Sequence, residues 1–177
     1  MDTGWQPVTW QIFHIISLNY NDSHKEEYKK FFRSFRTIIP CSICRGHYNS
    51  NLDKSEMNIE NNVNQENIFN WTVLLHNKVN KMHSKKIWSN EEAKNFYSGN
   101  RFNIHALFKY FILAYIRSNF RKGPEKTQQL FNMLHSFPYL HPNEDKRKQL
   151  IDFTTKFQIS RENIKSWLYS FLMLLKN

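Results

Sequence analysis

The stretch QENIFNWTVLLHNKVNKMH, residues 65–83, decides the fold of this chain. Its apolar side chains recur at helical spacing, so one side of a helix over these residues is apolar. The residues on that side are Ile68, Trp71, Leu75, Val79 and Met82. The stretch therefore predicts a helix that packs by one face against other helices.

The same periodicity predicts further helices before and after this one. In the first half they cover about 8–18, 23–38 and 41–51, and a short fifth helix begins at the capping box Ser89-Asn90-Glu91-Glu92. Pro40 ends the second helix, because a proline restricts the residue before it and cannot donate a backbone hydrogen bond. The Asn- and acid-rich residues 52–64 read as a loop. No segment reads as a strand, so we predict an all-α fold.

A second region follows Ser98-Gly99, with helices expected over about 103–120, 125–135, 143–156 and 161–175. Residues 1–97 carry 12 basic and 10 acidic side chains, net +2, whereas residues 98–177 carry 13 and 5, net +8. We therefore expect two domains, 1–98 and 99–177. The second would pack on itself or on the first, or would offer a surface to a substrate, to an acidic partner or to a second copy.

Composition excludes several classes of protein. The chain has 177 residues, a net charge of +10 and 40% hydrophobic residues, which is enough for a packed core. Its basic residues are scattered, which argues against a nucleic-acid partner. The start of the chain does not resemble a secretory signal, and its longest apolar stretch, 104–116, is interrupted by Lys109 and too short to cross a bilayer. We expect an intracellular, cytoplasmic protein without a membrane segment.

The two cysteines of the chain lie in one tetrapeptide, Cys41-Ser42-Ile43-Cys44, so their chemistry is local. At a helix N-terminus this spacing brings the sulfurs within bonding distance and favours a thiolate, which indicates a redox pair. Zinc is the alternative, with Cys41, Cys44 and His47 as ligands and His76 or His83 as the fourth. A thioredoxin-like module is disfavoured, because no strand precedes Cys41.

A polar strip lies on the helix over residues 65–83. His76 and Asn80 are four residues apart, as are Asn77 and Lys81, so their side chains share a surface. The strip is either a solvated face with one core histidine or the holder of a flat, polar cofactor. In the first helix, His14 follows Trp10 by four residues and repeats the pairing of an aromatic ring with an imidazole.

Taken in order, three motifs resemble those of a known family. They are W-x-x-x-H at Trp10 and His14, P-C-x-x-C at residues 40–44, and W-x-x-x-x-H-N-x-V-N-K at residues 71–81. This order and spacing resemble the Erv/ALR family of FAD-linked sulfhydryl oxidases, over about residues 5–98. The resemblance implies a four-helix bundle with a short fifth helix and FAD bound at its mouth, followed here by the second small helical domain.

The resemblance also implies roles for individual residues. Cys44 would lie against the flavin, and Cys41 would be attacked by the substrate thiolate. Lys85 falls where the family has a basic residue suited to the pyrophosphate, and Tyr97 where it usually has a Trp near the adenine; Trp88 aligns with another aromatic. The FAD-binding set is then Trp10, His14, Tyr20, Cys44, His76, Asn77, Val79, Asn80, Lys81, Lys85 and Tyr97, and no metal is expected.

The chain departs from the family pattern at three points. Gln6 stands where the family usually has Gly, Asn90 stands where many members have Cys, and no second cysteine pair is present. Without such a shuttle pair, a protein thiol would react directly at Cys41 or through a separate thioredoxin-like relay protein. The resemblance implies that the electrons pass to O₂, giving H₂O₂, and that the protein forms a homodimer. Some viral members of the family are cytoplasmic, which suggests a location in a viral factory or virion.

Two other functions compete with this one. The chain could be a basic helical binding protein with a non-catalytic or zinc-bound C-x-x-C, or a helical scaffold without turnover. Bound flavin and oxygen consumption separate these alternatives.

Overall fold

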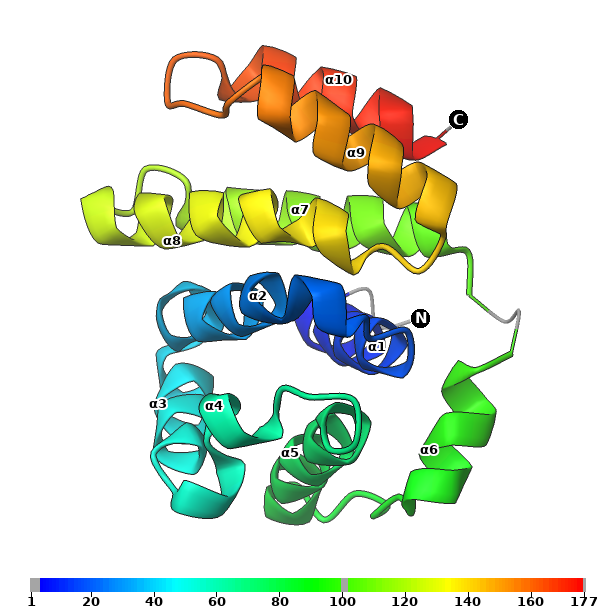
Figure 1. Ribbon diagram of the computed structural model, residues 1–177. Coiled ribbons are helices and arrows are strands. Elements are labelled where there is room, and N and C mark those ends of the chain that lie inside the picture. The colour runs from blue at the N-terminus through cyan, green and yellow to red at the C-terminus, as the bar shows by residue number, and fades with distance from the viewer. Residues whose placement is uncertain (1–3, 100–101, 177) are drawn as a thin grey trace.

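The computed structural model describes residues 4–99 and 102–176, and over these residues it is built of helices with no strand (Figure 1). The all-α prediction is confirmed. The α-helices are α1 (Trp5–Leu18), α2 (Lys25–Ile38), α3 (Ser42–Leu52), α4 (Ile59–Asn62), α5 (Ile68–Met82), α6 (Asn90–Tyr97), α7 (Ile104–Asn119), α8 (Pro124–Ser136), α9 (Glu144–Lys156) and α10 (Ile164–Lys176). Short 3-10 turns cover Asp22–His24, Ser55–Met57 and Phe137–Leu140.

The segment 52–64 differs from its prediction as a loop, since it contains the turn at Ser55–Met57 and the short helix α4. Asn58 caps α4 by accepting a hydrogen bond from the backbone N–H of Glu60 (2.7 Å). Met57 and Val63 are buried, and the carbonyl of Met57 accepts a hydrogen bond from Trp71 Nε1 (3.0 Å). Tertiary contacts therefore order a segment whose composition is typical of a loop.

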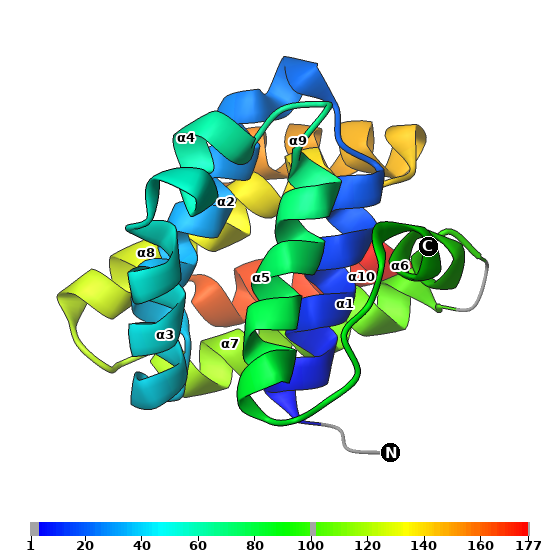
Figure 2. The same ribbon diagram turned by 90° about the horizontal axis from the view of Figure 1, so that it is seen from below.

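The first half forms a bundle with an aromatic centre. Figure 2 shows α1 and α5 side by side, with α6 next to α1, and with α3 on the left of the view, where it contacts α2. Phe13 of α1 packs edge-on against Phe32 and Phe35 of α2, with ring centroids 5.0 and 4.8 Å apart. Trp71 of α5 meets Phe32 at 4.7 Å. These edge-to-face contacts fix the bundle that carries the cysteine pair.

The second half packs directly on this bundle. Helix α8 lies along α2 and α7 lies against α1, while α9 and α10 form the layer above them (Figure 1). One buried cluster includes residues of both halves, with Phe111 of α7 in contact with Phe31 and Phe35 of α2. The expected boundary at residue 98 falls between α6 and α7. That residues 99–177 form a separate domain stays a prediction.

Two buried hydrogen bonds tie the halves together. Tyr115 of α7 lies 3.0 Å from Thr9 Oγ1, and the Thr9 hydroxyl donates to the carbonyl of Trp5 (2.7 Å), so the Tyr115 hydroxyl is the donor to Thr9. Asn119 Nδ2 donates to the carbonyl of Ile38 (2.8 Å) at the end of α2. The last two turns of α7 therefore hold both α1 and α2 of the first half in register.

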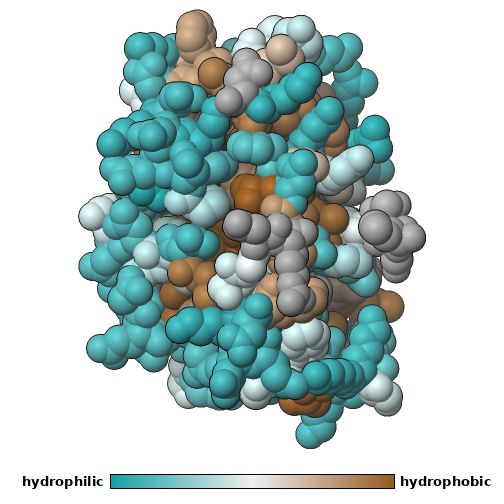
Figure 3. All heavy atoms as spheres, turned by 90° about the vertical axis from the view of Figure 1, so that its right-hand side faces the viewer, coloured by the Kyte–Doolittle hydropathy of each residue, from teal (hydrophilic) through white to brown (hydrophobic). Residues whose placement is uncertain are grey.

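The face that Figure 3 shows is mainly hydrophilic, with smaller hydrophobic areas near its middle. Within the described part of the chain, every helix is too short or too polar to span a lipid bilayer.

Replacing Tyr115 by Phe should lower the free energy of unfolding by about 1 kcal/mol, because the substitution removes the buried bond to Thr9 and keeps the ring. Urea unfolding followed by circular dichroism measures the change. Tyr110→Phe is the matched control on α7, since Tyr110 is 64% exposed, and its effect should be close to zero. Equal effects of the two substitutions would contradict the assigned contact.

Candidate active site

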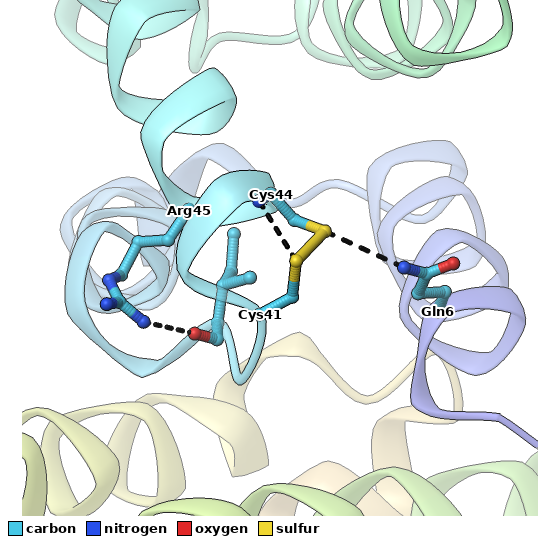
Figure 4. Close-up of a disulfide and its surroundings, with 5 residues drawn as sticks. Gln6, Cys41, Cys44 and Arg45 are labelled. Atoms are coloured by element: carbon cyan, nitrogen blue, oxygen red, sulfur yellow. Dashed lines mark hydrogen bonds between the residues drawn. A yellow bond between two sulfur atoms is a disulfide. The ribbon is translucent and has the colours of Figure 1, made fainter. Parts of the chain in front are cut away.

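The cysteine pair forms a disulfide where α2 passes into α3 (Figure 4). The Cα atoms of Cys41 and Cys44 are 5.2 Å apart. Cys41 is the N-cap residue of α3, and its sulfur accepts a hydrogen bond from the backbone N–H of Cys44 (3.1 Å). Pro40 ends the preceding segment, as the sequence predicts. The first sulfur of the pair therefore faces the positive end of a helix dipole.

The two cysteines have different surroundings. Cys44 packs against the hydrophobic core, and its sulfur lies 3.7 Å from Nε2 of Gln6 on α1. Ile43, between the cysteines, is 70% exposed. Arg45 turns away from the sulfurs and donates from Nη1 to the carbonyl of Ile39 (2.7 Å), at the end of α2 (Figure 4). Cys44 is thus the inner member, and an exposed apolar side chain lies next to the pair.

One face of α1 leads away from the disulfide. Gln6, Trp10 and His14 follow one another at four-residue spacing, so their side chains lie along one side of the helix. Gln6 contacts Cys44 at one end of this face. Trp10 stacks on His76 of α5, with ring centroids 4.3 Å apart and an interplanar angle of 6°. The face joins the cysteine pair to an aromatic cluster.

The centre of that cluster is a hydrogen-bonded histidine pair. His14 Nε2 lies 2.9 Å from His76 Nδ1, and His14 Nδ1 lies 3.3 Å from Thr72 Oγ1. Because the Thr72 hydroxyl donates to the carbonyl of Phe69 (2.8 Å), it accepts from His14 Nδ1. His14 Nε2 is then the acceptor and His76 Nδ1 the donor. This order of protons requires a neutral His14, and a neutral His76 then carries its lone pair on Nε2.

The electrostatics of the pair agree with that order of protons. Burial lowers the pKa of His14 to about 3, and the neighbouring His76 acts on it in the same direction. Burial lowers the pKa of His76 to about 4, with a smaller contribution from the positive charge of Lys85. Both side chains are therefore neutral at physiological pH, and Lys85 lies close enough to His76 to affect it.

Two asparagines of the polar strip fasten the connection that follows α5. Asn77 Nδ2 donates to the carbonyl of Trp88 (2.7 Å), and its Oδ1 accepts from the N–H of Trp88 (3.0 Å). Asn80 Nδ2 donates to the carbonyl of Lys86 (3.1 Å), and its own carbonyl accepts from the N–H of Lys85 (2.9 Å). The expectation of a merely solvated face is therefore wrong for these two residues, which hold one wall of the cluster.

Helix α6 closes the cluster on its remaining side. Tyr97 lies against His14 with ring centroids 4.5 Å apart, and burial raises the pKa of its hydroxyl to about 12. A cavity of about 10 Å³ remains between the helices. Its lining residues are His14, Val73, His76, Asn77, Trp88, Ala93 and Tyr97.

The predicted site residues divide into two groups. Trp10, His14, His76 and Tyr97 meet in one cluster, which Asn77 and Asn80 support, and Lys85 lies near it. The others have different surroundings: Tyr20 packs on Tyr28 and donates to Asp22 (3.0 Å), Val79 is half-buried, and Lys81 is exposed. A cofactor role for these three stays a prediction.

Sequence reasoning missed Thr72 and the contact of Gln6. Thr72 lies four residues before His76 on the same side of α5, so helical spacing alone could have indicated it. Gln6 departs from the family glycine, but nothing in the sequence indicates that its amide reaches a sulfur 38 residues away.

The structure does not support the alternative of a zinc site at Cys41, Cys44 and His47. Within residues 4–99 and 102–176, no three His, Cys, Asp or Glu side chains come together as a metal site. Both sulfurs are bonded to each other.

Comparisons with known proteins agree with this geometry. Residues 7–98 match the model of the Erv1 / Alr family, and the chain belongs to that family. It is 35% identical over 97 residues to the "FAD-linked sulfhydryl oxidase" of African swine fever virus (isolate Pig/Kenya/KEN-50/1950), covering 52% of this chain and 79% of the relative. It is 34% identical over 93 residues to the "Probable FAD-linked sulfhydryl oxidase R368" of Acanthamoeba polyphaga mimivirus, covering 50% and 65%. No solved structure shows a significant match.

The lowered pKa values of His14 and His76 predict that acid destabilises the fold. Below a pH of about 6.5 the unfolded chain binds protons on these histidines that the folded chain does not bind. The free energy of unfolding should therefore fall as the pH is lowered from about 6.5 towards 4, and urea unfolding at a series of pH values measures it. The decrease should be smaller in His14→Gln and unchanged in His83→Gln, the exposed control. A decrease of the same size in both variants would refute the buried pair.

Proposed function

We propose that this protein is an FAD-linked thiol oxidase that forms disulfides in protein substrates or in a dithiol relay partner. The observation that carries the proposal is the α1 face that joins the Cys41–Cys44 disulfide to the cluster of Trp10, His14 and His76. The match of residues 7–98 to the Erv1 / Alr family and the names of the viral relatives support it.

The residues of the cluster fit an FAD group. Trp10, Tyr97 and the two imidazoles offer flat surfaces for stacking, and the lone pair of His76 Nε2 offers an acceptor. Ser17, three residues after His14 on α1, is buried with no hydrogen-bond partner for its Oγ. That polar atom is suited to a polar group of a ligand. The cavity of about 10 Å³ is smaller than a tricyclic ring, so cofactor binding requires the aromatic side chains to turn.

Each part of the cofactor has residues of suitable chemistry. The aromatic and imidazole rings would hold the flavin and the adenine, and the exposed cations Lys81 and Lys85 would face the phosphates. When bound, FAD would accept the electron pair of the reduced cysteines and pass it to O₂, giving H₂O₂.

Thiol exchange takes place at the cysteine pair. A substrate thiolate attacks Cys41 Sγ, a mixed disulfide forms, and Cys44 leaves as a thiolate. A second substrate thiolate then attacks the substrate sulfur of the mixed disulfide and releases Cys41 as a thiolate. The substrate loses two electrons and two protons, and the Cys41–Cys44 pair gains the two electrons.

The N-terminus of α3 favours the second step. The N–H of Cys44 and the helix dipole stabilise negative charge on Cys41, which makes it a good leaving group. Cys44, packed on the core and facing Gln6, is the sulfur directed towards α1 and the cofactor site.

The number of cysteines in the chain determines which partners can reach the disulfide. With two cysteines in all, the protein has no internal shuttle pair, so a protein substrate or a thioredoxin-like relay must reach Cys41 itself. We also propose that the protein forms a homodimer and acts in the cytoplasm, in a viral factory or virion. The viral origin of the relatives supports the location.

Cys41→Ser or Cys44→Ser should abolish oxygen uptake driven by dithiothreitol, because either substitution removes the disulfide that accepts the electrons. An oxygen electrode measures the rate, and absorption near 450 nm shows whether flavin is retained. Ser50→Ala, an exposed position on the same helix, is the control and should keep the wild-type rate. Wild-type turnover in either cysteine variant would exclude the assigned roles.

His76→Ala should lose bound flavin, because it removes both the stacking partner of Trp10 and the hydrogen bond to His14. The ratio of absorption near 450 nm to that at 280 nm in the purified protein gives the occupancy. His83→Ala, just beyond the end of α5, is the control and should remain yellow. Full flavin occupancy in His76→Ala, or a colourless wild type, would overturn this site.

A further inference from the structure

An open groove of about 360 Å³ lies between the end of α7 and the start of α10. Most of its lining is apolar, with Phe120 and Leu168 half-buried in its walls. Three exposed cations stand on its rim: Arg117, Arg121 and Lys165. Among the described residues none of these three forms an ion pair, and no carboxylate lines the groove. The groove thus combines an apolar floor with unneutralised positive charge.

The end of α7 that lines the groove is bonded to the segment that precedes the disulfide. Asn119, which lies between Arg117 and Arg121 in the sequence, donates its buried hydrogen bond to the carbonyl of Ile38. Ile38 precedes Cys41 by three residues, a length of chain that spans at most about 11 Å. Figure 1 shows α7 ending and α10 beginning on the side where α2 passes into α3, and Figure 2 agrees. The end of α7 that lines the groove and the start of α3 that carries the cysteine pair therefore lie towards the same end of the molecule.

We propose that this groove docks an acidic segment with apolar side chains that belongs to the thiol-bearing protein substrate. The inference rests on the proposed thiol oxidase function and names the chemistry of its substrate. Carboxylates of the segment pair with the three rim cations, and its apolar side chains fill the floor. The exposed Ile43 offers a further apolar contact beside Cys41.

The shape and charge of the groove favour a peptide over other ligands. A nucleic acid would pair its phosphates with the cations but would leave the apolar floor unused. An acyl chain is better held in a closed cavity, whereas an open groove leaves the polar backbone of a peptide hydrated.

The test uses a fluorescein-labelled peptide of about twelve residues in which Asp and Glu alternate with Leu and Phe, bound to the full chain and followed by fluorescence anisotropy. A second peptide has Ser in place of Leu and Phe. A third carries a cysteine pair at one end, so that its oxidation can be followed by oxygen uptake.

The variant Arg117→Glu/Lys165→Glu reverses two rim charges. Its matched control is Lys109→Glu/Lys176→Glu, which makes the same change of charge on the same two helices at exposed positions at least two turns away. We expect the first variant to weaken peptide binding about tenfold and to raise the KM of the cysteine peptide similarly. The control should bind nearly as the wild type does, and both variants should oxidise dithiothreitol at the wild-type rate.

Several results would overturn the docking groove. They are equal weakening in both charge variants, equal binding of the Ser peptide, no binding at all, or a dimer that only the groove variant disrupts while peptide binding is unchanged. Failure of the wild type to oxidise dithiothreitol while the peptide still binds would overturn the proposed function instead. The two proposals can therefore fail separately.

Discussion

Helix α1 is packed on two opposite sides, and the rest of the site depends on that constraint. On one side it meets α5 and α6 through Trp10 and His14, and on the other it meets α7 through the bond between Thr9 and Tyr115. All residues from Ile12 to Ser17 are buried. Because close-packed interiors resist displacement, α1 cannot turn towards or away from the aromatic cluster without breaking contacts with the second half. Helices α7 and α8 of the second half thus fix the positions of α1 and α2 in the half that carries the cysteine pair.

The parts of the molecule that the sequence predicts are those with local causes. Helical periodicity places α2 and α5, Pro40 separates α2 from α3, and the capping box at Ser89 begins α6 as expected. The position of the cysteine pair at a helix N-terminus follows from the same local signals. At the beginning of α1 the helix starts at Trp5 rather than near residue 8, because Pro7 is compatible with a first helical turn.

The features that the sequence does not predict depend on neighbours that are distant along the chain. The segment 52–64 becomes ordered through the bond between Trp71 and the carbonyl of Met57, and the asparagines of α5 find their partners only when residues 85–88 fold back on them. The direction of the protons in the His14–His76 pair depends on Thr72 and on the carbonyl of Phe69. Periodicity can place such side chains on a face, but it cannot give the partner that a buried polar atom requires.

Charge is distributed differently in the two halves of the chain. The interior around His14 and His76 excludes charge, because burial makes a protonated imidazole costly there. The second half, net +8, has one buried lysine, Lys146, and keeps most of its other described cations exposed to water, where they can attract a partner over about a Debye length. Asn119 connects the two regions through a neutral hydrogen bond to the backbone at Ile38. This bond fixes the position of α7 relative to α2 but carries no net charge. Charged residues on the surface of α7 and α10 can therefore be substituted without altering the electrostatics around the histidine pair.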